Sequence, residues 1–199
     1  EYSDKWLECE LQDIADLSKG AGISKDQLSE TGESCILYGE LYTKYKSEVI
    51  SNVVSKTNIE STNLVRSKAN DVIIPSSGET AIDISTARCV PYDNILLGGD
   101  LNIIRLKDQD GRFFSYQLNG VRKLDIAQIA QGVSVVHLYG ESLKRLKVRY
   151  PSKSEQEKVS SLLSLIDERI ETQNRIIAKL QSLMQGLNDY LQDSVPLSY

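Results

Sequence analysis

The sequence predicts an α+β fold in which a strand-rich globular domain at residues 1–150 is followed by a long helix within residues 151–199. Short apolar runs separated by Gly, Ser, Pro and Asn fill the first part, as expected for strands joined by turns. Residues 155–192 then contain no proline and a single glycine, Gly186. A helix over that stretch would be roughly 55 Å long, more than the width of the domain, so part of it should leave the globule.

Runs rich in Ile, Val, Tyr and Phe are predicted to contain the strands. They are CILYGELYTKY (35–45), DVIIPSSGET (71–80), NILLGGDLNIIRL (94–106), GRFFSYQL (111–118), GVSVVHLYG (132–140) and LKRLKVRYP (143–151). Short helices are expected at residues 11–18 and 121–131, because apolar side chains recur there at helical spacing: Leu11, Ile14, Ala15 and Leu17 in the first, and Leu124, Ile126 and Ile129 in the second.

The start of the long helix is marked by residues that favour a helix N-terminus. Pro151 follows the last predicted strand, and Ser152 or Ser154 can cap the helix. Glu155 and Glu157 lie in the first turn, where negative charge suits the helix dipole.

The long helix carries a narrow apolar stripe, which we call the seam, whose members follow alternating steps of four and three residues. A sustained 3.5-residue period is typical of a coiled coil, whereas a helix on a globular core shows a broader face with a 3.6-residue period. The seam therefore predicts pairing with another helix. Gln173 either sets the register or is a solvated interruption. The seam residues are Val159, Leu163, Ile166, Ile170, Gln173, Ile177, Leu180, Met184, Leu187 and Leu191.

Composition limits the class of protein. The 199 residues, 40% of them hydrophobic, are enough for one core and an appendage. No run is apolar and long enough to span a membrane, and the first residues lack a signal-peptide pattern, so a cytoplasmic location is expected. The net charge of −5 argues against DNA binding by electrostatics alone. It leaves room for a protein that reads bases from a local patch while a partner supplies phosphate contacts.

Motifs that mark catalytic sites are missing from the sequence. No phosphate-binding glycine loop, nucleophile elbow or zinc motif occurs, so we predict neither a catalytic residue nor a metal site. Cys9, Cys35 and Cys89 are far apart and without CxxC spacing, which favours buried, reduced thiols. His137 is the only histidine, and its place in an apolar run favours a structural or surface role over general base catalysis.

Residues 38–46, YGELYTKYK, have the composition of a recognition surface. Tyr42 and Tyr45 are interleaved with Lys44, a mixture that can stack on bases while contacting phosphates. A strand with one tyrosine face on the core would contain the same residues. Both interpretations stay open at the level of sequence.

Residues 19–25, KGAGISK, predict a turn that could approach a phosphate. Gly20 lies between Lys19 and Lys25, and a glycine turn lets backbone amides come close to an anion. A plain surface turn would use the same residues.

Two further turns carry polar side chains that can donate and accept hydrogen bonds at base edges. PSSGET presents Ser76, Ser77 and Thr80, and IAQGVSV presents Gln131 and Ser134. Ordinary hairpin turns are built from the same residues. The DNA-binding assignment of all four stretches is therefore a hypothesis.

The order of these features resembles the specificity subunit of type I restriction-modification systems. In that family a target recognition domain ends in a Gly-Ser turn and a Leu-containing strand, and a proline then leads through Glu-Gln into a long helix with an Ile-Asp pattern. The opening WLECELQDIADLSKGAGISKDQL also resembles the start of such a domain. The matching residues are Gly132, Ser134, Leu143, Leu146, Pro151, Glu155, Gln156, Ile166 and Asp167, preceded by Trp6, Leu11, Ile14 and Gly20.

The resemblance implies a non-catalytic DNA reader that bridges other subunits. Methyltransferase subunits would hold S-adenosylmethionine, and restriction subunits would use ATP and Mg²⁺, so this chain itself needs no cofactor. Family members usually contain two recognition domains and two long helices packed antiparallel. The present sequence has one of each, so its partner would be a second copy or the second half of the specificity subunit.

Such a pair would separate two half-sites on DNA about one helical turn apart. A homodimer would recognise an interrupted palindrome, and pairing with a different half would recognise two unlike sequences. The alternative from another class is a coiled-coil scaffold whose globular domain binds protein, which the low net basicity favours. A DNA-modifying enzyme is disfavoured because nucleotide-binding and amino-methyltransferase motifs are missing.

If the helix acts as a ruler, inserting or deleting one heptad between Ile166 and Leu187 will alter the spacer between the half-sites. The reason is that helix length sets the separation of the two recognition domains. Mapping of methylated adenines in cells measures the spacer, and unchanged spacing would rule the ruler out.

Overall fold

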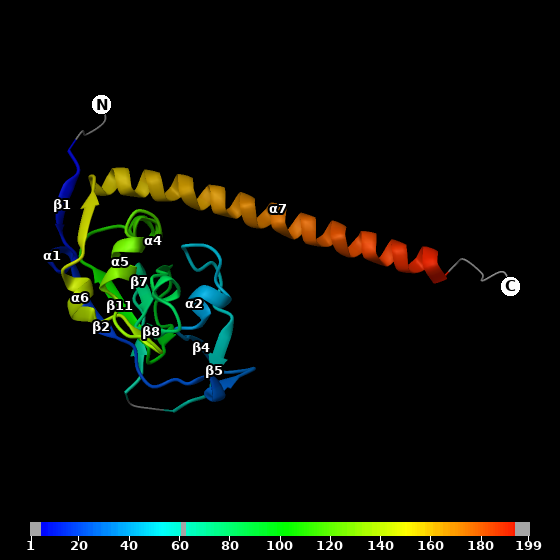
Figure 1. Ribbon diagram of the computed structural model, residues 1–199, viewed down its shortest axis with the longest axis horizontal. Coiled ribbons are helices and arrows are strands. Elements are labelled where there is room, and N and C mark those ends of the chain that lie inside the picture. Colours follow the sequence, from blue (N-terminus) through cyan, green and yellow to red (C-terminus); the bar gives the residue numbers. More distant parts are fainter. Residues whose placement is uncertain (1–4, 61–62, 194–199) are drawn as a thin grey trace. The chain divides into compact units, whose positions relative to one another are not determined.

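A four-stranded antiparallel sheet runs through the domain in the order β2–β11–β7–β9 (Figure 1). Its strands are β2 (Ala15–Lys19), β11 (Leu101–Leu106), β7 (Asp71–Pro75) and β9 (Arg88–Val90). The computed structural model describes residues 5–60 and 63–193. They form two compact units, and the division between them falls after Ser160.

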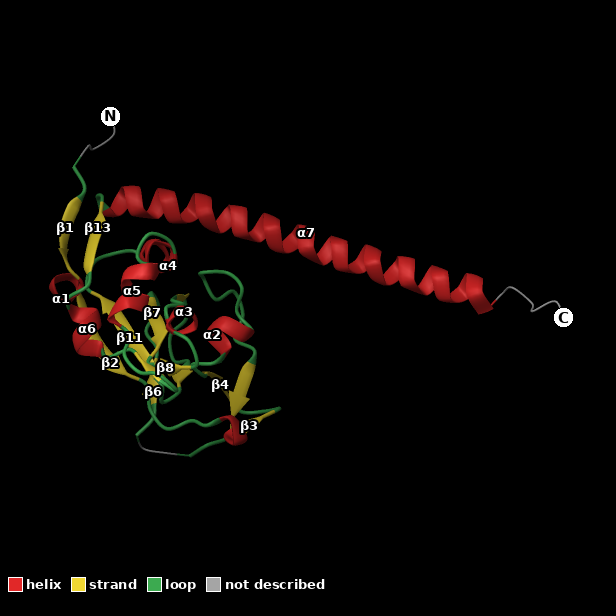
Figure 2. Ribbon diagram, viewed as in Figure 1, coloured by secondary structure: helices red, strands yellow, loops and turns green. Residues whose placement is uncertain are grey.

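Three further sheets, most of them built from shorter strands, complete the described part of the first unit (Figure 2). A five-stranded sheet has the order β3–β5–β4–β10–β6, in which only β10 and β4 are parallel. β1 pairs with β13 and β8 with β12, both antiparallel. The bounds are β1 Leu7–Glu10, β3 Leu28–Ser29, β4 Glu33–Ile36, β5 Ser55–Thr57, β6 Val65–Arg66, β8 Ser77–Gly78, β10 Leu96–Leu97, β12 Val136–His137 and β13 Lys147–Tyr150.

Both faces of the sheet are buried along its two central strands, β7 and β11. Successive side chains of a strand point to opposite faces. Val72, Ile74 and Ile104 accordingly enter one hydrophobic cluster, while Ile73 and Ile103 enter another. The sheet thus forms the shared wall between two cores.

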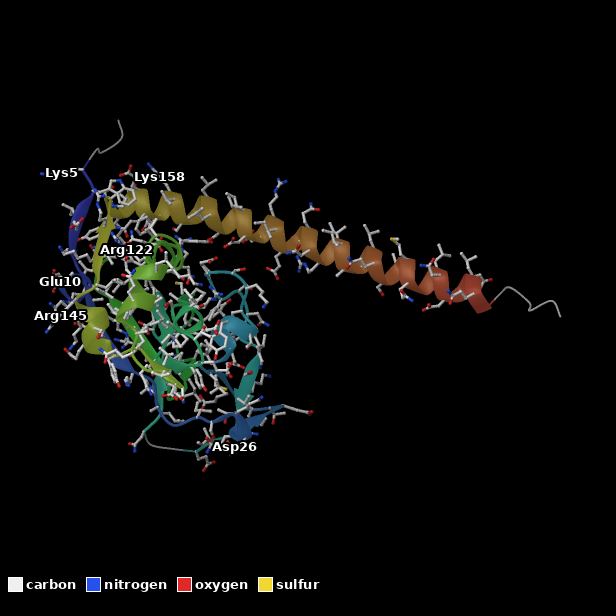
Figure 3. The ribbon with its side chains drawn as sticks, viewed as in Figure 1. Lys5, Glu10, Asp26, Arg122, Arg145 and Lys158 are labelled. Atoms are coloured by element: carbon white, nitrogen blue, oxygen red, sulfur yellow. The ribbon has the colours of Figure 1, made fainter. Side chains whose placement is uncertain are left out.

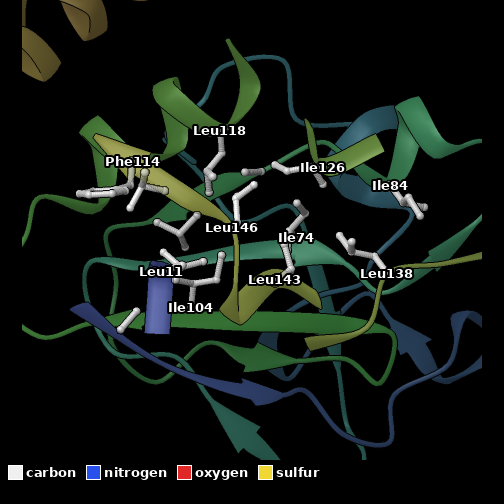
Figure 4. Close-up of a cluster of buried hydrophobic side chains, with 14 of the residues drawn as sticks. Leu11, Ile74, Ile84, Ile104, Phe114, Leu118, Ile126, Leu138, Leu143 and Leu146 are labelled. Carbon is white, nitrogen blue, oxygen red and sulfur yellow. The ribbon is translucent and has the colours of Figure 1, made fainter. Parts of the chain in front are cut away.

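Short helices cover the two faces. The first cluster packs against helices near the sheet, with Phe114, Leu118 and Ile126 among its buried members (Figure 4). These helices are α1 (Leu11–Ile14), α3 (Ala81–Ile84), α4 (Gly111–Asn119), α5 (Lys123–Ile129) and α6 (Gly140–Lys144). The second cluster includes Leu41 of α2 (Glu40–Thr43), and the 3₁₀ helix η1 spans Lys25–Gln27.

One predicted element was wrong in type, and two others were only partly right. Residues 111–118 form the helix α4 rather than a strand, because Asp110 caps its N-terminus by accepting hydrogen bonds from the backbone N–H groups of Arg112 (2.8 Å) and Phe113 (3.4 Å). In residues 35–45 the strand ends at Ile36 and α2 follows, where Glu40 Oε2 accepts a hydrogen bond from the Leu37 N–H at 2.9 Å. The helix predicted at 11–18 ends at Ile14 and continues as β2.

Other predictions agree with the structure more closely. Strands occur within residues 71–80 and 94–106, and α5 lies within the helix expected at 121–131. Of the residues expected on its inner side, Ile126 is buried while Leu124 is exposed. The last predicted strand is divided, because α6 occupies its first residues and β13 its last.

The long C-terminal helix α7 spans Lys153–Asp193, which confirms the predicted α+β class with a terminal helix. It begins after Ser152, whose carbonyl oxygen accepts hydrogen bonds from the N–H groups of Glu155 and Gln156, each at 3.0 Å. Even this helix is not apolar enough to cross a membrane, and the same holds for every other helix within residues 5–60 and 63–193. Its pairing as a coiled coil stays a prediction.

Buried hydrogen bonds hold the first turns of α7 to the start of α4. Gln156 has no exposed surface; its Oε1 accepts from the Asp110 N–H at 3.1 Å, and its Nε2 donates to Gln109 Oε1 at 2.6 Å and to the Pro151 carbonyl at 2.9 Å. The Ser160 hydroxyl, one turn further on, donates to Asp110 Oδ2 at 2.8 Å. Positions 156 and 160 lie on the same helix face.

Asp110 links this contact to α4. Its carboxylate accepts hydrogen bonds from the Arg112 guanidinium, at 3.2 Å from Nε and 2.8 Å from Nη2. Burial by itself would raise the pKa of Asp110, but the hydrogen bonds from Arg112 and Ser160 outweigh it and hold the pKa below its usual value. We call the set Gln109, Asp110, Arg112, Gln156 and Ser160 the joint.

The charge of Asp110 should stabilise the domain in a pH-dependent way. Asp110→Asn is expected to lower the free energy of unfolding by about 2 kcal/mol at pH 7, because a buried carboxylate with charged and hydroxyl donors is lost. Since the folded pKa is depressed, this contribution is present above the unfolded pKa of about 3.9 and disappears as pH falls through the folded pKa. Urea unfolding at pH 7 and pH 3 should therefore show the two proteins converging; a constant difference would contradict the role of the charge.

Candidate nucleic-acid interface

Three strands of the central sheet bring distant loops to one edge. β2 ends at Lys19 opposite Asn102, and β7 ends at Pro75 opposite Leu101, the first residue of β11. Because β11 is antiparallel to both neighbours, the segments that follow β2 and β7 leave the sheet on the same side. Figure 3 shows Asp26 of η1, in the loop region after β2, at the other end of the domain from Lys158 in the first turns of α7.

The segment 19–25 is fixed by backbone contacts rather than by a free turn. Gly20 N–H donates to the Leu101 carbonyl at 3.0 Å, and Ala21 N–H donates to the Leu97 carbonyl at 3.0 Å. A Cβ atom at Gly20 would overlap the carbonyl oxygen of Gly98, so only glycine permits this approach. The exposed Lys19 and Lys25 flank the contact.

The segment 38–46 forms α2 and its flanking residues. The three residues predicted there to contact DNA lie in different surroundings. The Lys44 ammonium donates to Glu40 Oε1 at 2.6 Å and to Ser55 Oγ at 2.9 Å, while its side chain remains 46% exposed. Tyr42 is half-buried. Tyr45 is only 7% exposed and belongs to the second core cluster, where burial raises its pKa to about 12. Tyr45 therefore packs in the core instead of facing solvent.

These two segments line one hollow of about 710 Å³ between η1, α2 and the turn before β11. Lys25 comes from the first segment and Lys44 from the second. Tyr38, Leu28 and Leu37 add aromatic and apolar surface. A hollow with apolar walls and lysines can hold a planar group that carries or adjoins an anion.

The remaining two segments are joined by a small sheet. Ser77 pairs with His137 in the β8–β12 ladder, and Gln131 exchanges backbone hydrogen bonds with His137 at 2.9 and 2.7 Å. The Tyr42 hydroxyl lies near Gly78 of β8, so α2 borders this part of the surface as well. All four segments singled out in the sequence are thus contiguous along the sheet edge.

Exposure divides the polar residues of these segments. Gln131 and Ser134 are exposed, whereas Ser76 and Ser77 are buried. Thr80 is exposed but caps α3: its Oγ1 accepts from the Asp83 N–H at 3.1 Å and donates to Asp83 Oδ2 at 2.6 Å. The buried serines can support the loop but cannot reach a large ligand without a change in conformation.

An exposed apolar tip was missed by the sequence prediction. Val133 is 97% exposed and Val135 is 52% exposed, beside the positive-φ residue Gly132. His137 and Tyr139 are both exposed and stack with their ring centroids 6.0 Å apart. The alternating pattern of residues 132–140 had indicated a half-buried strand, and only Gly132 signalled a turn.

The three cysteines are free thiols, and burial raises the pKa of each, so none of them is an activated nucleophile. Cys35 and Cys89 are buried free thiols, as predicted, and Cys9 is half-buried. Burial raises the pKa of Cys35 to about 11 and that of Cys89 to about 12, which keeps both protonated at neutral pH. Over the residues that the structure describes, no His, Cys, Asp and Glu side chains cluster as metal ligands.

The predicted seam lies along α7, with every member except the half-buried Leu163 exposed. A second set of exposed apolar residues lies beside it on the same helix, which we call the flanking row. It consists of Leu162, Leu165, Ile176, Leu183 and Tyr190. Together the seam and the flanking row make the apolar face broader than a two-helix seam requires.

Comparison with known proteins gives a family and several similar folds. The family model described as "Type I restriction modification DNA specificity domain" matches residues 3–182. The S subunit of a type I restriction-modification system from M. genitalium has 20% sequence identity and a TM-score of 0.64, over 96% of this chain and 45% of that one.

Two further solved structures have a similar fold. A chain from a study of complex assembly and conformational transition of the type I R-M system has 12% identity and a TM-score of 0.67, over 97% of this chain and 46% of that one. The HsdS subunit from Thermoanaerobacter tengcongensis has 13% identity and a TM-score of 0.58, over 95% and 45%. The present chain thus spans a little under half of the length of each of these proteins.

Proposed function

The chain belongs to the family of type I restriction-modification DNA specificity domains, and we propose that it reads one half of a two-part DNA target. Specificity subunits of these systems are non-catalytic. The observation that carries the proposal is the meeting of residues 19–25, 38–46, 76–80 and 131–134 at one edge of the central sheet.

Within this surface, phosphate and base contacts would be made by different residues. Lys19, Lys25 and Lys44 are exposed cations that suit the DNA backbone. Gln131, with Ser134 beside it, can form hydrogen bonds to base edges in the groove. Val133 and Val135 at the hairpin tip can contact a thymine methyl group.

The other residues predicted to form the DNA-binding site would mainly support its surface. Gly20 lets the backbone of its loop pack against the turn before β11, and Tyr42 borders β8. Thr80 is exposed and can contact DNA with the hydroxyl lone pair that its capping bonds leave. Tyr45, Ser76 and Ser77 are buried and would shape the surface from below.

The seam would pair antiparallel with the equivalent helix of a second copy or of another half of the specificity subunit. A two-fold axis at residue 175 places every seam residue opposite a seam residue of the partner, so it buries the most apolar surface. The resulting layers are Val159 with Leu191, Leu163 with Leu187, Ile166 with Met184, Ile170 with Leu180, and Gln173 with Ile177.

Methyltransferase subunits would bind the paired helices along the flanking row. In an antiparallel pair the positions that flank the seam face their own counterparts across the axis, so Ile176 meets Ile176 of the other helix. One side of the pair then carries the flanking row, which Arg169 interrupts, whereas the opposite side carries Asp167, Asn174 and Gln181. The methyltransferase would supply S-adenosylmethionine, and restriction subunits would supply ATP and Mg²⁺ chemistry, while this chain holds no cofactor.

A scaffold that binds protein is the second candidate function, favoured by the net charge of −5 and the exposed apolar tip. Footprinting with the cognate methyltransferase present distinguishes the two, because only a DNA reader protects two separated half-sites.

Lysine and glutamine substitutions should have different effects on DNA binding by the complex with methyltransferase. Lys19→Ala is expected to weaken binding to all DNA sequences alike, because one phosphate contact is lost. The slope of the logarithm of the binding constant against the logarithm of salt concentration should decrease in magnitude by about 1. Gln131→Ala should instead make the binding free energy on the cognate half-site less favourable by about 1–3 kcal/mol and relax the base preference at one position of the target. Binding titrations at several salt concentrations on cognate and altered sites measure both.

Lys68 provides the matched control. It is exposed and precedes β7, at the opposite edge of the sheet from Pro75. Lys68→Ala should leave affinity and salt slope unchanged; equal effects at Lys19 and Lys68 would argue against a localised surface.

The register of the helix pair can be tested by disulfide cross-linking of the purified chain. With Ile170→Cys and Leu180→Cys in the same chain, oxidation should give a covalent dimer, because these positions face each other across the proposed axis. The control combines Ile170→Cys with Met184→Cys, which lie about one helical turn out of register. Equal yields from both pairs, or a monomer throughout, would be incompatible with this seam.

A further inference from the structure

We propose that the joint sets how strictly the protein selects the spacing between its two half-sites, an inference that rests on the proposed function. Gln156 and Ser160 are then positioning residues: they contact no DNA but fix the direction in which the recognition domain holds the helix. Helix length would set the preferred spacer length. The joint would set how strongly the complex discriminates against spacers one base pair longer or shorter.

The contacts of the joint are specific for one rotation of the helix. The hydrogen-bonding atoms of the Gln156 amide contact Asp110, Gln109 and Pro151 at 2.6–3.1 Å, in a place with no exposed surface. Ser160 binds the Asp110 carboxylate from the next turn. A helix turned by one residue moves its side chains by about 100° and would leave these buried groups without partners, which is unfavourable. The joint therefore favours a single rotation of the first turns of α7 against the loop before α4.

A peripheral ion pair adds to the same face. The Lys153 ammonium lies 2.7 Å from Asp108 Oδ1, one turn before Gln156. Both side chains are largely exposed, so this pair contributes little by itself. Lys153, Gln156 and Ser160 follow steps of three and four residues, and all three contact residues 108–110.

A small change in angle at the joint would produce a large displacement further along the helix. Residue 175, the proposed centre of the pair, lies about 22 Å along the helix from Ser160 at 1.5 Å per residue. A change of about 10° at the joint would move that centre by about 4 Å, roughly one base-pair step of 3.4 Å along DNA. A loose joint would therefore accept neighbouring spacers that a rigid one rejects.

The sheet contains a matched control for loss of stability. Arg105 of β11 binds the buried Asp71 carboxylate of β7 through Nε at 2.8 Å and Nη2 at 2.6 Å, and neither residue belongs to the joint. Arg105→Met removes hydrogen bonds to a buried carboxylate, as Ser160→Ala does in the joint, but leaves Gln156 and Ser160 in place. It separates an effect of stability from an effect of position.

The test measures methylation by the full chain assembled with its methyltransferase. The substrates are plasmids in which the two mapped half-sites are separated by the natural spacer or by one base pair more or fewer. For Gln156→Leu and Ser160→Ala, the ratio of methylation at the natural spacer to that at its neighbours should fall by about tenfold. The bases read within each half-site should not change.

The outcomes separate the joint from the proposed function. Broader spacing in both joint variants, with Arg105→Met retaining the wild-type ratio, supports it. Wild-type spacing in Ser160→Ala, whose single missing oxygen leaves the fold least disturbed, overturns it, and so does equal broadening by Arg105→Met. If the wild-type complex methylates no spacer in a half-site-dependent way, the proposed function fails instead, and the result is distinguishable from failure of the joint alone.

Discussion

Burial of the Gln156 side chain is the constraint on which the two-part organisation depends. A primary amide with no exposed surface is tolerable only because its donors and its acceptor find partners, two of them in the loop before α4. That loop in turn is fixed by Asp110, which caps α4 and binds Ser160. The Glu-Gln passage that resembles the family pattern therefore has a physical role, since Gln156 fastens the first turns of α7 to the core.

The recognition surface depends on sheet register in the same way. Antiparallel pairing places Lys19 opposite Asn102 and Pro75 opposite Leu101, so loops separated by more than fifty positions in the sequence meet at one edge. A slip by one residue would exchange the side chains between the two faces of the sheet and move the loops apart. Because the two faces pack against different hydrophobic clusters, the exchange would disrupt the packing of both, so such a slip is strongly disfavoured.

The sequence predicted those elements whose structure is determined by nearby residues. It failed where contacts with residues distant in the sequence determine the structure. The 41-residue helix α7 was evident from its period alone. Residues 111–118 were mistaken for a strand because Phe113 and Phe114 suit either structure, and the Asp110 cap that favours a helix was overlooked. Composition identified four segments that the fold brings together, but it could not show that Tyr45 packs inward or that Val133 is exposed. Burial depends on neighbours distant in sequence.

The net charge of −5 explains why reading and spacing should be coupled. A surface with few cations, of which Lys44 already pairs with Glu40, would bind a half-site weakly by itself. Linking two weak contacts raises affinity strongly, but only when both ends can engage at once. Each half can then remain selective without binding unrelated DNA tightly. With a rigid connection, only one of the two recognition domains can contact its half-site when the spacing is wrong. Because a single domain binds weakly, such a site is then not bound, and the complex discriminates between spacings.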